Sequence, residues 1–164
     1  MKKWIWIISF IIILIIGYVI ASYMVGVNAQ TKDEEKGAAI AKDEGGLASV
    51  SESYVFRGKK AYYIVTGKDS ESVKQVLWIP KDGKNTHIAK RKYSEGATRS
   101  EILEKVKSTG LPVSIVSAKI GMIEFNKDKN REIWEVVFKD EKGKLNYYYY
   151  DFFTGDMLRN YENI

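Results

Sequence analysis

The segment Glu132–Leu158 has the sequence EIWEVVFKDEKGKLNYYYYDFFTGDML. In its first part, Trp134, Val136 and Phe138 fall on one face of an extended chain, the period-2 pattern of a half-buried strand. The polar segment 140–144, DEKGK, contains glycine and has the length of a hairpin connection. The sequence therefore predicts two antiparallel strands joined by a tight turn.

The second of these strands, predicted over Leu145–Phe153, is almost wholly aromatic. Alternation places Tyr147 and Tyr149 on one face and Tyr148 and Tyr150 on the other. Aromatic pairs across strands stabilise a sheet, and the stretch contains no set of residues suited to catalysis. One face enters the core. The other contacts the neighbouring unit, contacts a partner, or stays partly exposed with its hydroxyls in water, and the sequence leaves these possibilities open.

The composition excludes several classes of site. The chain has 164 residues, no cysteine and a single histidine, His87. Disulfides, cysteine-based metal or redox sites and Cys–His catalytic pairs are therefore excluded. Without Lys2 and Lys3, 24 basic and 21 acidic side chains remain, a net charge of +3. These charges are interspersed, so we expect no nucleic-acid-binding face.

The N-terminal segment predicts a membrane anchor. Trp4–Val25 contains no charged residue, and as a helix it is long enough to span a hydrocarbon core of about 30 Å. Lys2 and Lys3 favour a cytoplasmic N-terminus, which places residues 30–164 outside the cell membrane. The alternative is a signal peptide cleaved near Ala29. The apolar run is longer than the about 7–15 residues usual in signal peptides, which favours a retained anchor.

Beyond the anchor, a helix followed by strands is predicted twice. The first helix begins at Thr31, which has capping-box spacing to Glu34, and ends at Gly45–Gly46; alternatively it continues from the membrane helix. The strands expected after it cover residues 47–56, 61–66, 73–79 and, as an edge strand that carries His87, 85–90.

The second unit repeats this order. Thr98 and Glu101 form another capping box, an apolar stripe follows, and Gly110 ends the helix. Its strands are expected over residues 113–125 (interrupted near Gly121), 131–139, 145–153 and 157–161. The fold class is therefore α+β, and the predicted division is 1–29 (cytoplasmic tip and anchor), 30–93 (first unit) and 94–164 (second unit).

The C-terminal motif resembles the PepSY domain, whose pattern is a W-x-V strand, a hairpin and then Y-x-D-x-x-T-G. Trp134, Tyr149, Asp151, Thr154 and Gly155 carry this resemblance. The order of anchor, first unit and PepSY unit resembles the YpmB/TseB-like family of Gram-positive bacteria. This resemblance implies two tandem cystatin-like units outside the membrane, and regulation of cell-wall elongation through a penicillin-binding protein. PepSY domains elsewhere are associated with peptidase inhibition.

Most conspicuous side chains are interpreted as structural. We expect the Asp151 carboxylate to accept backbone N–H groups of the turn at Thr154–Gly155. Trp78 and Trp134 are expected in the core, and His87 on an exposed edge. The basic run Lys90–Lys92 is expected on a solvated face.

The candidate partner-binding residues are the four consecutive tyrosines Tyr147, Tyr148, Tyr149 and Tyr150. No catalytic, metal-binding or cofactor-binding residue is predicted, because no nucleophile, base and orienting group occur at suggestive spacing. The sequence predicts a non-catalytic, membrane-anchored interaction module that modulates a cell-surface enzyme. The alternative is a peptidase inhibitor or pro-region-like modulator of a surface protease.

Overall fold

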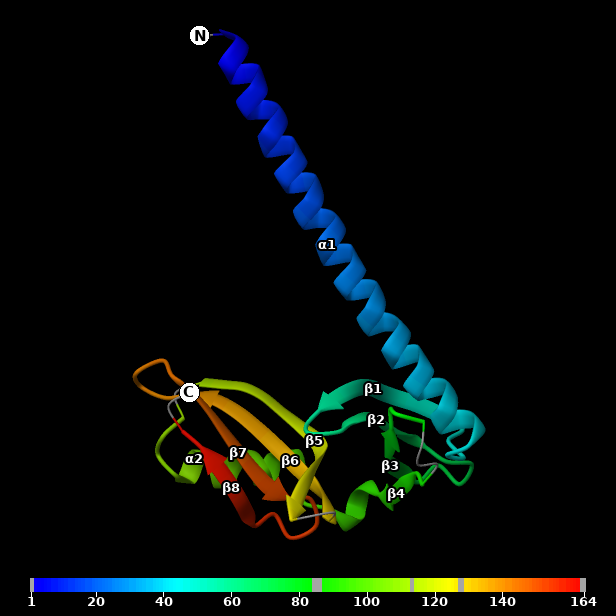
Figure 1. Ribbon diagram of the computed structural model, residues 1–164. Helices are drawn as coiled ribbons and strands as arrows, with labels where there is room; N and C mark the ends of the chain where they lie inside the picture. The colour runs from blue at the N-terminus through cyan, green and yellow to red at the C-terminus, as the bar shows by residue number, and fades with distance from the viewer. Residues whose placement is uncertain (1, 84–86, 113, 127–128, 163–164) are drawn as a thin grey trace.

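The computed structural model describes residues 2–83, 87–112, 114–126 and 129–162. One long helix, α1 (Lys2–Asp43), is followed by two four-stranded antiparallel sheets, and a short helix, α2 (Arg99–Ser108), lies between the sheets in the chain. Most of α1 projects away from the sheets, and only its C-terminal part lies against the first one (Figure 1). The predicted α+β fold with a helix for each sheet is confirmed.

Helix α1 is continuous from the apolar segment into the first unit. Thr31 does not begin a helix: its hydroxyl donates to the carbonyl of Val27 at 3.1 Å, a bond within the helix. The helix ends at Asp43; Gly46, just beyond it, has φ of +69°, and Lys90 donates to the Gly45 carbonyl at 2.9 Å. Of the two possibilities for this segment, the continuous helix is therefore correct. In length and composition α1 is suited to crossing a membrane.

The first sheet has the order β1-β2-β3-β4, formed by β1 (Ser49–Arg57), β2 (Ala61–Lys68), β3 (Lys74–Pro80) and β4 (Ala89–Lys92). The C-terminal part of α1 packs closely on it at Gly37, where an added Cβ would lie 2.8 Å from the Ser53 hydroxyl. The start predicted for the edge strand (residues 85–90) is wrong. His87 lies before β4, which begins at Ala89, and residues 84–86 lie outside the described residues.

The second sheet has the order β5-β6-β7-β8, formed by β5 (Ser114–Asn126), β6 (Lys129–Lys139), β7 (Leu145–Asp151) and β8 (Met157–Tyr161). Helix α2 begins with the predicted capping box: the Thr98 hydroxyl accepts from the Glu101 N–H at 3.3 Å, and the Glu101 carboxylate accepts from the Thr98 N–H at 2.6 Å. Ile102 and Val106 of its apolar stripe are fully buried.

Two predicted strand details are wrong. β5 runs through Gly121 without interruption, and its register shifts lie at Ile115/Ser117 and Glu124/Asn126. β7 ends at Asp151, so Phe152 belongs to the following turn and not to the strand.

A single hydrophobic core joins the two sheets. The Trp78 indole N–H donates to the Gly121 carbonyl at 2.8 Å, and the Tyr54 hydroxyl donates to the Ile120 carbonyl at 2.8 Å. The ring of Phe152 meets that of Trp78 edge-on at 5.2 Å between centroids. An added Cβ on Gly121 would lie 2.5 Å from the Phe56 ring, so the absence of a side chain lets the sheets approach. Gly121 is therefore part of the joint between the sheets.

Candidate functional site

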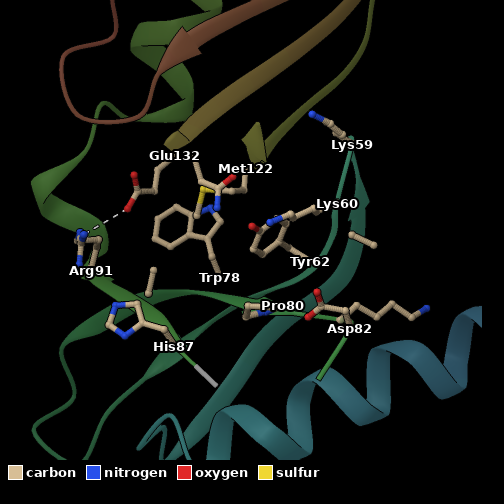
Figure 2. A pocket seen from close by; sticks show the side chains of 14 residues that line it. Lys59, Lys60, Tyr62, Trp78, Pro80, Asp82, His87, Arg91, Met122 and Glu132 are labelled. Atoms are coloured by element: carbon tan, nitrogen blue, oxygen red, sulfur yellow. Dashed lines mark hydrogen bonds and ion pairs between the residues drawn. The ribbon is translucent and has the colours of Figure 1, made fainter. Parts of the chain in front are cut away.

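A groove of about 650 Å³ lies where the two sheets meet. Figure 2 shows Tyr62, Trp78 and Pro80 of the first sheet facing Met122 and Glu132 of the second. Trp78 is fully buried, and Tyr62 and Met122 are 6% exposed, so the apolar floor is closed. The groove is thus a surface depression above the joint.

The charged side chains around this groove connect elements to one another. Arg91 in β4 and Glu132 in β6 form an ion pair at 3.2 Å that crosses from one sheet to the other (Figure 2). Lys59 pairs with Glu124 at 2.7 Å, again between the units. In the run Lys90–Lys92, predicted on a solvated face, Lys92 is exposed, whereas Lys90 is half-buried and binds the carbonyl of Gly45 just beyond α1.

Two carboxylates are among the described residues that line the groove. Among the described residues that line it, the carboxylates are Asp82 and Glu132, which lie on opposite sides in Figure 2. Exposed His87 also lines the groove. Within the described part of the chain, no group of three or more His, Asp or Glu side chains comes together to hold a metal ion. The residues that line the groove come from both sheets, as expected where two sheets pack together.

Asp151 lies where the C-terminal motif turns. One of its carboxylate oxygens accepts the N–H groups of Phe153 at 2.9 Å and Thr154 at 3.0 Å, and the other pairs with Arg131 at 3.3 Å. Lys105 of α2 donates to the Gly155 carbonyl, which ties the helix to the same turn. The hydrogen bonds expected at Asp151 are present.

The structure separates the four candidate tyrosines by face. Tyr148 and Tyr150 are only 2% exposed, because their side chains pack in the core beneath α2. Their prediction as partner-binding residues is therefore wrong: a buried ring is not available to a partner. Tyr147 and Tyr149 lie on the opposite face and are half-buried.

Tyr149 belongs to a surface on the outer face of the second sheet that we call the tyrosine face. Across the β7–β8 ladder, Tyr147 pairs with Tyr161 and Tyr149 with Arg159. The rings of Tyr149 and Tyr161 meet edge-on at 6.0 Å. The guanidinium of Arg159 lies 5.9 Å from the ring centre of Phe125. The tyrosine face thus comprises Phe125, Tyr147, Tyr149, Arg159 and Tyr161.

The tyrosine face includes a partly buried polar pair. The Tyr149 hydroxyl interacts with the carboxylate of Glu135, and the two residues are partners across the β6–β7 ladder. Burial raises the pKa of Glu135, while the bond from Tyr149 and the charge of Lys119 act in the opposite direction. Burial and the nearby Glu135 raise the pKa of Tyr149, so this hydroxyl stays protonated at neutral pH.

Sequence reasoning missed Phe125, Arg159 and Tyr161 as members of this surface. Alternation within β8 indicates that Arg159 and Tyr161 share a face, but it does not show which residues of β7 they meet. That depends on the register shift between Tyr149 and Tyr150, which no local pattern reveals.

Comparisons with known proteins all point to one protein family. A family model described as the cell wall elongation regulator TseB-like domain matches residues 36–80. A Bacillus subtilis protein named probable cell wall elongation regulator TseB is 32% identical over 151 residues, which are 92% of this chain and 90% of that protein. The solved structure of the YpmB protein from Bacillus subtilis has a TM-score of 0.67 and 32% identity, and the match covers 77% of this chain and 94% of that one.

Proposed function

The chain belongs to the TseB-like family of cell wall elongation regulators, and from that premise we propose that it is a non-catalytic membrane protein that regulates elongation through a penicillin-binding protein. It crosses the membrane once through Trp4–Val25, with Lys2 and Lys3 in the cytoplasm and residues 30–164 outside. Residues 30–93 and 94–164 are its two cystatin-like units, the second of PepSY type.

The observation that carries this proposal is the tyrosine face. It combines tyrosine rings with an arginine guanidinium on an outward face, and tyrosine and arginine are enriched in the energetically important parts of protein interfaces. Tyr161 is 44% exposed, and Tyr149 is half-buried beside its cross-strand partner Glu135, so part of the surface is accessible to a partner. We propose that Tyr147 and Tyr149 contact the partner.

In-cell photocrosslinking tests this proposal. The full-length chain carries a benzophenone amino acid in place of Tyr147, and a matched chain carries it at Ser70, an exposed position in the turn between β2 and β3. We expect the Tyr147 variant, but not the Ser70 variant, to capture a penicillin-binding protein. Capture of a protease at Tyr147, together with its inhibition by the purified chain, would overturn the proposal in favour of a peptidase inhibitor.

A further inference from the structure

We propose that the end of the second sheet that carries the β6–β7 hairpin rests on the anionic phospholipid headgroups of the membrane that holds α1. We call this surface the hairpin rim; it consists of Leu111, Val116, Lys139, Lys142 and Lys144. The inference rests on the membrane anchoring in the proposed function and adds a second contact with the bilayer.

The first step is the rigid connection between membrane and sheets. Helix α1 is continuous from the apolar segment to Asp43, and its C-terminal part is fixed on the first sheet by buried Ala41 and the close approach at Gly37. Between the apolar segment and this packed part lie residues 26–32, which rise only about 10 Å in a helix. The sheets are therefore held close to the bilayer surface.

The second step is the direction in which the second sheet extends. Gly26 of α1 and Lys119 of β5 line the same crevice, of about 360 Å³, so β5 passes beside the part of α1 next to the membrane segment. From Lys119 the edge strand continues for about 17 Å to Ser114, which pairs with Lys139 at the hairpin. In Figure 1, α1 leans over the second sheet, and β5 and the hairpin lie on the side of the sheet toward which it leans.

The third step is the chemistry of the hairpin itself. Lys139, Lys142 and Lys144 are exposed. The Asp140 carboxylate accepts the N–H groups of Lys142 and Lys144, both at 2.9 Å, and thus faces into the turn. The hairpin thus carries three exposed lysines, and Glu141 is its exposed acidic side chain. The outer surface of the hairpin is therefore positively charged.

Apolar side chains accompany these lysines. Leu111 is 40% exposed and shares a groove with residues 140–142. Val116 is 56% exposed at the register shift of β5, where the strand departs from regular pairing with β6. Apolar side chains among lysines suit the boundary between headgroups and acyl chains, with the amines near lipid phosphates and the apolar groups below them. Anionic lipid is thus the partner whose chemistry this surface matches.

A fluorescence experiment tests the contact in the full-length chain. Because the chain has no cysteine, Lys142→Cys and the control Ser70→Cys each take one environment-sensitive label. Ser70 lies in the turn between β2 and β3, two residues after Lys68, whose carbonyl accepts from the N–H of Ala48 shortly beyond the end of α1 that is away from the membrane segment. The labelled proteins are reconstituted in phosphatidylcholine vesicles with or without phosphatidylglycerol, and quenching by spin-labelled headgroups is measured.

With phosphatidylglycerol, we expect quenching at position 142 to exceed that at position 70 by about threefold or more, and to fall when Lys139→Glu and Lys144→Glu are added. Equal quenching at the two positions, in protein that floats with the vesicles and unfolds like the parent, would overturn the headgroup contact and leave the anchor intact. Equal quenching at position 142 in both lipids would overturn the role of lipid charge. A chain that does not float would overturn the anchor as well, independently of crosslinking at Tyr147.

Discussion

The two sheets have the same strand order but differ in how many faces are covered. The first sheet is covered by α1 on one face and by the second unit on the other, and residues 62–67 of β2 are buried without a break. In the second sheet, β7 alternates between buried and half-buried residues over 145–150. The alternating burial of β7 thus marks a sheet with one open face, and the unbroken burial of β2 marks a sheet covered on both.

This difference also separates the roles of the two units. The helix of the first unit is the extension of the membrane helix, so the anchor and the packing of that unit depend on each other. Helix α2 is local and begins with its own cap. The second unit therefore presents the open face, and the first unit connects that face to the membrane.

The strongest test of the joint between the sheets is Gly121→Val. The new side chain would overlap the Phe56 ring, which an added Cβ already approaches to 2.5 Å. We expect a loss of about 3 kcal/mol in the free energy of unfolding, measured by denaturant titration of the full chain in detergent. Gly58→Ala is the control because its nearest neighbour, the Met122 carbonyl oxygen, lies at 3.4 Å. A similar loss in both variants would contradict a close approach specific to Gly121.

Replacement of each buried tryptophan distinguishes contacts between the sheets from contacts within one unit. Trp78 donates to Gly121 across the joint, whereas Trp134 donates at 2.9 Å to Ala97, next to the start of α2. We expect Trp78→Phe and Trp134→Phe each to cost about 2 kcal/mol, since a buried carbonyl loses its donor. Hydrogen exchange should increase in both sheets for Trp78→Phe, and mainly in α2 and the second sheet for Trp134→Phe. If hydrogen exchange increased in the same segments in both variants, the two tryptophans would not differ in which sheets they stabilise.

Two threonines with the same spacing to a glutamate test the difference between the helices. Thr98→Ala removes the cap of α2, and we expect a cost of about 1 kcal/mol by thermal unfolding. Thr31→Ala changes a residue in the middle of α1 and should cost less than about 0.5 kcal/mol. Equal costs would argue that residue 31 also begins a helix.

The smallest expected effect concerns the open face and depends on pH. Because burial raises the pKa of Glu135 in the folded state, its stabilising contribution is complete below its ordinary pKa and is lost as pH rises through the raised value. Glu135→Gln keeps an acceptor for Tyr149 without the charge. We expect the melting temperature of the variant relative to the parent to be higher at pH 8 than at pH 4. A difference independent of pH would show that Glu135 titrates normally.

Local signals predicted much of the fold and little of the candidate surface. The hairpin at Asp140–Lys144, the cap at Thr98 and the turn at Asp151 depend on hydrogen bonds between near neighbours in the chain, and all are present. The tyrosine face depends on the pairing of β7 with β8 and on the position of Phe125 in β5. Its members could therefore not be grouped before the strands were placed.

The apolar N-terminal segment, the two groups of strands and the capped second helix could be predicted from local patterns, because periodicity and capping act over a few residues. Three outcomes required the folded chain: Thr31 lies within a continuous helix, Gly121 lies at the joint between the sheets, and Tyr148 and Tyr150 are buried while Tyr147 and Tyr149 are half-buried. These outcomes depend on contacts between distant segments, such as Trp78 with Gly121 and Tyr54 with Ile120. The side chains that form them carry no local sign of the residues they will meet.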